Sequence, residues 1–269
     1  MKHDLSLSPF GATVSELTSA ARLAEAEGFD AVWTYDHVSG VSANANWVLD
    51  PWVTLTSIAS ATDRIHLGPL VLNATTRHPA HIAVAAATLQ EASGGRLMVG
   101  MGAGAGHDRF GAEVGMIGLP RLSAAERRDR TEESVTAVRA LWRGASDLDG
   151  THHTLSDAAG FLRPDPEPII VVGVNGPKMS ALAGRVADAV NIHGVEEHLE
   201  QLADVARESS GNRAFPITVE APLTPFWLDG DGYRRLVEMD TARVMYQWSV
   251  RQGHEVISEA AARLRGAGH

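Results

Sequence analysis

An acidic and an imidazole side chain stand next to each other at Asp36 and His37, near the end of a strand-like segment that begins near Asp30. Near neutral pH an imidazole can donate a proton, and a neighbouring carboxylate can orient it or balance its charge. Because successive strand residues point to opposite sides, only one of the pair faces a pocket unless the chain turns there. The residues alone do not decide whether Asp36 and His37 transfer a proton or whether His37 has a structural role.

A glycine loop at residues 102–106 (GAGAG) has a composition suited to ligand binding. The small residues, with glycine at Gly102, Gly104 and Gly106, would let a flat ring or a phosphate approach the backbone closely. The loop lacks the spacing of a Walker phosphate-binding motif, and a tight turn would use the same glycines.

A second loop, residues 173–178 (GVNGPK), lies between an apolar segment and a helical one. Pro177 suits the first turn of a helix, where free backbone N–H groups and the helix dipole attract anions. Lys178 would add a positive charge at the same place. These features favour an anion site, and a turn that needs glycine for its geometry is the alternative.

A regular alternation of strands and helices positions these loops. Strand-like segments begin near residues 4, 30, 64, 96, 168, 188, 215 and 242, and helical segments separate them. This order predicts an α/β protein with a parallel sheet, and eight such units close into a TIM (β/α)8 barrel. Barrel enzymes keep their active sites at the C-terminal ends of the strands, where the loops described above lie.

Helix-start signals support this alternation. Pro79 stands where a helix can begin, and the glycines at residues 94–95 stop it. Asp50 followed by proline predicts another helix start, and Ser123 with Glu126 fits a capping box.

The chain is predicted to form a single domain, residues 1–269, with one irregularity in its spacing. The fourth and fifth strands are separated by about twice the chain that one helix requires. Residues 143–167 therefore predict an insertion with a short hairpin. It would form a wall over the barrel mouth or, alternatively, a surface loop without a role.

The composition is that of a globular protein, with 44% hydrophobic and 21% charged residues. A net charge of −10 argues against nucleic-acid binding, which needs a basic surface. The most basic segment, residues 121–130, is interleaved with acids and is better interpreted as a solvated helix face than as an anion site. His78 and His81 lack an evident third ligand, so we expect no metal site.

The chain has no cysteine, which excludes a thiolate nucleophile and a disulfide framework. It also lacks an apolar run long enough to cross a membrane and a signal-peptide pattern at its start. We therefore expect a cytoplasmic protein that does not bind a membrane.

Three segments in order resemble one family: residues 28–38 (GFDAVWTYDHV), residues 63–106, and residues 171–190 (VVGVNGPKMSALAGRVADAV). They are similar to the luciferase-like family of flavin- and deazaflavin-dependent oxidoreductases, which are TIM barrels. The motifs TYDH and GVNGPKM look closer to the branch that uses coenzyme F420, a deazaflavin, than to the FMN monooxygenases.

The resemblance implies roles for individual residues at the barrel mouth. In the deazaflavin branch the matching Asp-His pair contacts the cofactor, which makes His37 the first catalytic candidate and Asp36 the second. The family has a non-prolyl cis peptide that forms a bulge behind the ring, and here it would join Leu70 and Val71. Asn73 would then donate to the polar edge of the ring.

The resemblance also implies where the rest of the cofactor binds. The loop after the fifth strand would hold the cofactor phosphate, and the loop after the fourth strand would lie against the cofactor. The residues expected there are Gly173, Asn175, Gly176, Pro177 and Lys178 in the first loop, and Gly102, Gly104 and Gly106 in the second.

The sequence departs from the family's sugar-phosphate dehydrogenases at Ala105, where they place a catalytic glutamate. Oxidation of glucose 6-phosphate is therefore not expected. His107 and Asp108 are the nearest polar residues, and His107 is a candidate for the substrate pocket. Trp47, in a polar stretch, is expected to border the pocket, either stacking on a substrate or packing against the rim.

The resemblance implies an oxidoreductase that transfers a hydride between coenzyme F420 and a small organic substrate. The alternative within the family is an FMN-dependent monooxygenase that takes reduced flavin from a separate reductase. A cofactor-binding protein without catalysis also stays open because of Ala105. A metal-dependent barrel hydrolase would need a pair of histidines after the first strand, where this chain has residues 6–9 (SLSP) instead. Self-association, as a homodimer, is a further implication of the family.

Overall fold

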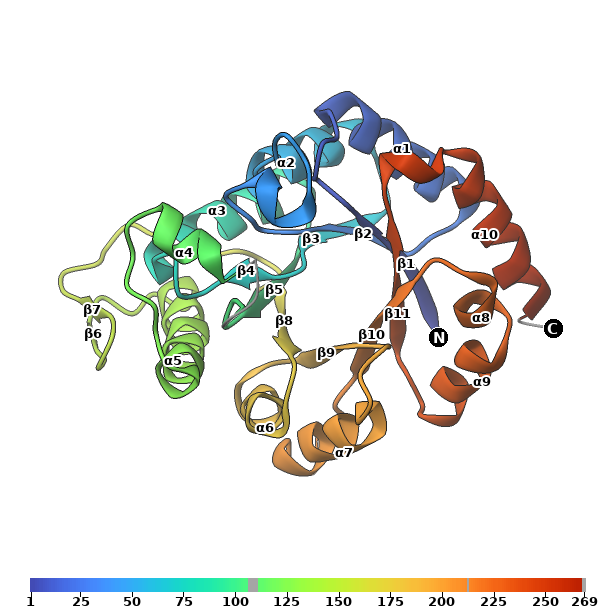
Figure 1. The fold of residues 1–269 in the computed structure, drawn as a ribbon. Helices are drawn as coiled ribbons and strands as arrows, with labels where there is room; N and C mark the ends of the chain where they lie inside the picture. The colour runs from blue at the N-terminus through green and yellow to red at the C-terminus, as the bar shows by residue number, and fades with distance from the viewer. Residues whose placement is uncertain (106–110, 212, 268–269) are drawn as a thin grey trace.

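Parallel strands form a closed ring in the computed structural model, which describes residues 1–105, 111–211 and 213–267 (Figure 1). The order around the nine-stranded sheet is β3-β2-β1-β11-β10-β9-β8-β5-β4, and a bridge between Leu67 and Leu97 brings β3 back to β5. The strands are β1 (Lys2–Leu7), β2 (Ala31–Thr34), β3 (His66–Pro69), β4 (Leu72–Asn73), β5 (Met98–Gly102), β8 (Ile169–Val174), β9 (Ala189–His193), β10 (Ile217–Pro222) and β11 (Arg243–Trp248).

Helices surround this ring and connect successive strands, as Figure 1 shows. They are α1 (Val14–Glu27), α2 (Pro51–Ala61), α3 (Pro79–Ala92), α4 (Ala112–Met116), α5 (Ala124–Trp142), α6 (Pro177–Val186), α7 (Leu199–Ser209), α8 (Pro225–Leu228), α9 (Asp231–Glu238) and α10 (Glu255–Ala267), with short 3-10 turns η1 (Gly40–Ala43) and η2 (Val250–Gln252). The predicted TIM barrel is confirmed, and all eight predicted strand segments lie in it. The strand predicted to begin near residue 64 is split into β3 and β4.

The predicted helix starts are also present. Asp50 accepts hydrogen bonds from the first backbone N–H groups of α2, and Pro79 begins α3. Ser123 and Glu126 form the predicted capping box at the start of α5. None of the helices in the described ranges combines the length and hydropathy needed to cross a bilayer.

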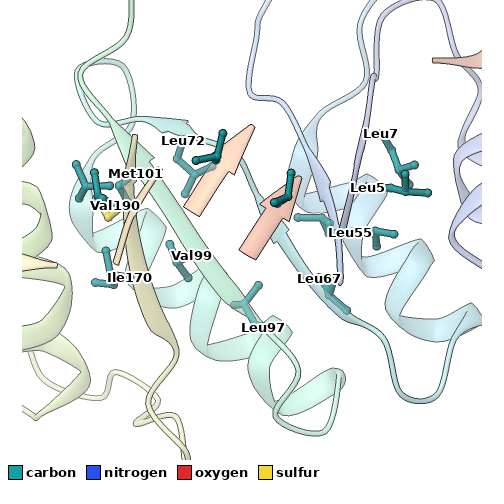
Figure 2. Packing of buried hydrophobic residues seen from close by; sticks show 14 of the residues in the cluster. Leu5, Leu7, Leu55, Leu67, Leu72, Leu97, Val99, Met101, Ile170 and Val190 are labelled. Atoms are coloured by element: carbon teal, nitrogen blue, oxygen red, sulfur yellow. The ribbon is translucent and has the colours of Figure 1, made fainter. Parts of the chain in front are cut away.

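Two apolar layers hold the barrel together, one outside the ring and one inside it. The outer layer packs strand residues against the helices, and Figure 2 shows part of it with Leu5, Leu67, Val99 and, from α2, Leu55. Parallel strands covered on both faces need apolar side chains on both sides. The inner layer is smaller and consists of Ala31, Trp33, Leu70, Met98, Val171, Ala189 and Met245, with Val71 packed against it.

The predicted insertion contains the expected hairpin, formed by β6 (Leu148–Asp149) and β7 (Thr154–Leu155). Its predicted place over the barrel mouth is wrong. The carboxylate of Glu133 on α5 accepts the backbone N–H of His152 at 2.9 Å, and His153 lies 3.1 Å from the hydroxyl of Ser134. These contacts hold the hairpin against the outside of α5, and no residue of 143–167 lines the cavity described below.

A buried ion pair lies inside the ring at its N-terminal end. The Asp4 carboxylate, fully buried, accepts a hydrogen bond from the indole N–H of Trp33 at 2.8 Å and pairs with Arg243. Burial raises the pKa of Asp4 from 3.8 to about 6, against the opposing attraction of Arg243.

The raised pKa of Asp4 predicts a pH dependence of stability. Between pH 3.8 and about 6 the folded protein binds a proton at Asp4 that the unfolded chain has lost, so stability falls as pH rises through this window. Asp4→Asn removes this contribution. The difference in unfolding free energy, wild type minus variant, should fall by up to about 3 kcal/mol between pH 4 and pH 7 in urea titrations. Asp204→Asn, the same change on the exposed face of α7, is the control, and a difference that stays constant with pH would contradict the assignment.

Candidate active site

A cavity of about 870 Å³ opens at the C-terminal ends of the barrel strands. Such a cavity is the usual place for the active site of a barrel enzyme. Nine of the residues predicted from the sequence line it, and they come from the ends of four strands: Asp36, His37, Leu70, Val71, Asn73, Gly102, Gly104, Gly173 and Asn175.

The Asp36 carboxylate is bound by other groups and does not pair with His37. It accepts two hydrogen bonds from the Arg77 guanidinium, at 2.8 and 2.7 Å, and one from the backbone N–H of Asn73 at 3.0 Å. The side chain of Asp36 is 4% exposed. Arg77 also reaches Asp50, the residue that caps α2, at 3.0 Å. The hydrogen bonds to Asp36 raise the pKa of Arg77, so the guanidinium stays charged. Asp36 is placed to position the loop after β4.

The partner of His37 is a glutamate that the sequence analysis missed. Glu113, buried on α4, lies with Oε2 3.2 Å from Nδ1 of His37 and accepts the backbone N–H of Val38 at 3.1 Å. Its other oxygen accepts the hydroxyl of Ser42 at 2.7 Å. The ring of Phe10 packs against the imidazole, with centroids 5.0 Å apart. The histidine at the cavity wall is therefore held by a carboxylate, an arrangement that suits proton transfer.

A bulge at Leu70 and Val71 forms part of the cavity wall, and its peptide bond is cis, as predicted. Glycines leave the space that it occupies. A Cβ atom at Gly102 would lie 2.6 Å from a methyl carbon of Val71, and one at Gly173 would lie 3.0 Å from the other methyl carbon. A Cβ atom at Gly100 would lie 2.2 Å from the Pro69 carbonyl oxygen. These distances are shorter than ordinary carbon contacts, so the glycines seat the bulge.

Gly104 likewise leaves the space that the side chain of Asn73 occupies. Gly104 has a φ of +64°, and a Cβ atom there would lie 2.6 Å from the amide nitrogen of Asn73. The side-chain oxygen of Asn73 accepts the hydroxyl and the backbone N–H of Thr75, at 2.7 and 3.0 Å. This leaves the amide N–H₂ end of Asn73 directed toward Gly104, beside the cavity.

Other predicted residues do not line this cavity. Gly176 and Pro177 open α6, and Lys178 is exposed in its first turn. Trp47 is also outside the lining and 49% exposed, and its indole N–H donates to the Ala12 carbonyl at 2.9 Å. It packs against the rim, as one of the two alternatives predicted. The candidates Gly106 and His107 lie outside the described residues.

A polar cluster that was not predicted from the sequence lines the cavity opposite His37. The Glu220 carboxylate on β10 accepts the hydroxyl of Tyr35 at 2.8 Å and lies 3.1 Å from Nδ1 of His193. Burial and the nearby Glu220 charge raise the pKa of the Tyr35 hydroxyl, so it remains a donor. A carboxylate within the apolar run of residues 217–222 is the signal that would have indicated Glu220.

A model of the luciferase-like monooxygenase family matches residues 2–229 of the chain. The match covers most of the sequence and includes every cavity residue described above. The chain belongs to the luciferase-like monooxygenase family.

Among its relatives, the F420-dependent glucose-6-phosphate dehydrogenase of Beutenbergia cavernae is 36% identical over 178 residues, 64% of this chain and 51% of the relative. The 5,10-methylenetetrahydromethanopterin reductase of Methanolobus tindarius is 34% identical over 181 residues, 67% of this chain and 50% of the relative. The chain thus spans about half the length of these relatives.

Solved structures share the fold at lower identity. An F420-dependent secondary alcohol dehydrogenase, in complex with an F420-acetone adduct, has a TM-score of 0.81 at 20% identity and covers 98% of this chain and 99% of its own. The coenzyme F420-dependent tetrahydromethanopterin reductase of Methanopyrus kandleri has a TM-score of 0.78 at 17% identity, covering 98% of both chains.

The glycine at residue 102 provides a test of the seat for the bulge. Gly102→Ala places a Cβ atom against Val71, so we expect a loss of about 1–3 kcal/mol in unfolding free energy, as for other overpacked sites. Gly266→Ala, the same change where no atom lies within 4 Å, is the control and should not destabilise the protein. Equal stability of the two variants in denaturant titrations would contradict this role of Gly102.

Proposed function

We propose that this chain is an oxidoreductase that transfers a hydride between coenzyme F420 and a small organic substrate. The observation that carries the proposal is the bulge at Leu70 and Val71, seated on glycines in the cavity wall together with His37. The F420-dependent relatives and structural neighbours support the same cofactor. When bound, the deazaflavin supplies or accepts the hydride.

The residues present fit such a cofactor. Leu70 and Val71 offer an apolar surface on which a flat ring can rest, and the adjacent loop carries only small residues at 102–105. The amide of Asn73 can donate to a polar edge of the ring. Lys178 and the free backbone N–H groups at the start of α6 are the proposed contacts for the cofactor phosphate, beside the cavity residues Gly173 and Asn175.

His37 is the proposed catalytic residue, and its task is to move a proton. When a carbonyl is reduced to an alcohol, its oxygen needs a proton, and oxidation of the alcohol releases that proton. The imidazole of His37 can exchange it because Glu113 holds the ring at the cavity wall and balances a positive charge on it. Glu113 and Asp36 are positioning residues in this proposal.

The oligomeric state and the cellular location of the protein are predicted from its resemblance to the family. The alanines of α3 do not themselves favour a dimer interface, because Ala83, Ala86 and Ala87 are buried against the chain's own core. A homodimer in the cytoplasm is the proposed state, which sedimentation velocity and cell fractionation would test.

Cofactor titration is the direct test of this proposal. We expect micromolar binding of F420, followed by its absorbance and fluorescence, and much weaker binding of oxidised or reduced FMN. Tight binding of reduced FMN with oxygen consumption would contradict the proposal. It would instead indicate a monooxygenase that depends on a flavin reductase as its partner.

Substitution of His37 tests the proton-transfer role. His37→Ala should retain most of the F420 affinity, because the contacts proposed for the ring and the phosphate lie in the loops around Val71, Gly102 and Gly173, and should lose roughly 100-fold or more in turnover. His81→Ala, an exposed histidine on α3, is the matched control and should behave as the wild type. Full activity of His37→Ala in stopped-flow assays would remove His37 from the mechanism.

A further inference from the structure

A second imidazole–carboxylate pair faces the cavity, and the proposed proton transfer does not use it. The Glu220 side chain is 4% exposed and lies 3.1 Å from His193, whose own side chain is 49% exposed. The Tyr35 hydroxyl donates to the second oxygen of Glu220 at 2.8 Å. One oxygen of the buried Glu220 carboxylate contacts Nδ1 of the half-exposed His193. This contact orients the imidazole toward a ligand in the cavity.

The two pairs lie on opposite sides of the barrel. His37 follows β2 and His193 ends β9. Around the ring, β1, β11 and β10 separate these strands on one side, while β3 with β4, β5 and β8 separate them on the other. Tyr35, which directly follows β2, donates its hydroxyl to Glu220 on β10, and both residues line the cavity. Both imidazoles line the same cavity, so a substrate placed between them would present its reacting end to His37 and its other polar group to His193.

The charge of the cavity wall is negative. Its described lining contains the carboxylates Asp36, Glu113, Glu196 and Glu220, and it contains no lysine or arginine among residues 1–105, 111–211 and 213–267. Of these four carboxylates, Asp36 is paired with the Arg77 guanidinium. An anionic group near His193 would face Glu196 and Glu220 in a site partly shielded from water, where like charges repel strongly.

We propose that the wall made by His193, Glu196 and Glu220 selects substrates that are uncharged or cationic and excludes those with a phosphate or carboxylate. The inference rests on the proposed function, because it names the substrate class of the same site. His193 binds a hydroxyl, carbonyl or amine of the substrate, and Glu220 holds the ring in place. The chain thus differs in substrate class from the relatives whose substrate is a sugar phosphate.

Three probes of similar shape and different charge test this selection: cyclohexanol, cyclohexylamine and cyclohexanecarboxylate. Their affinities are measured by saturation-transfer NMR on the F420-loaded protein at neutral pH. We expect cyclohexanol and the protonated amine to bind at least about tenfold more tightly than the carboxylate. Equal or tighter binding of the carboxylate overturns the proposal, and so does the absence of binding by all three probes.

A charge reversal in the wall provides a matched pair of variants. Glu196→Lys should shift the preference toward the carboxylate by about tenfold or more, because it replaces a repelling group with an attracting one. Glu197→Lys makes the same charge change at the neighbouring residue, which is exposed and outside the cavity lining, and should bind the probes as the wild type does. Equal shifts in the two variants overturn the proposal.

This test separates the substrate class from the identity of the cofactor. If the chain fails to bind F420, the proposed function fails in the cofactor titration itself. The probe series is then measured on the protein without cofactor, with the same expected order and the same overturning results, because the wall residues belong to the chain.

Discussion

The ion pair between Asp36 and Arg77 holds together the parts of the barrel mouth on which the candidate site depends. Its carboxylate joins the end of β2 to the backbone of Asn73, and Arg77 extends the link to Asp50 at the start of α2. Removing one partner of a buried ion pair leaves the other charge without compensation, so substitution of Asp36 or Arg77 is expected to destabilise the barrel mouth. The bulge at Leu70 and Val71 lies just before the loop that this pair secures, and His37 follows Asp36 directly.

Glycines complete this arrangement from the neighbouring strands. Gly100 and Gly102 on β5 and Gly173 on β8 provide the space for Pro69 and Val71, while Gly104 provides the space for Asn73. The same glycines could be expected to bring a ligand close to the backbone, and they do line the cavity. The contacts in the structure show, however, that these glycines make room for other residues of the same chain. They allow β4 to pair with β5 and complete the barrel. The cavity wall that a ligand would contact depends on this pairing.

Much of the fold could be predicted because its signals are local. Apolar strands, proline at helix starts and capping residues such as Ser123 act within a few positions, and the structure has them where the sequence indicates. The partners of the site residues could not be predicted in this way. Glu113 meets His37 from a short helix 76 positions away, and Glu220 meets Tyr35 across 185 positions. Both contacts depend on ring closure.

The loop after β9 combines one packed position, Gly194, with neighbouring positions that are open to solvent. A Cβ atom at Gly194 would lie 3.1 Å from the Trp227 ring, so a side chain there would require the packed indole to shift. His193 and Val195 are exposed on either side of it, and Glu196 is partly exposed. Mutations at these three positions can therefore accumulate with little effect on the packed core. The loop is a natural place for directed evolution to begin, with Gly194 left unchanged in every library.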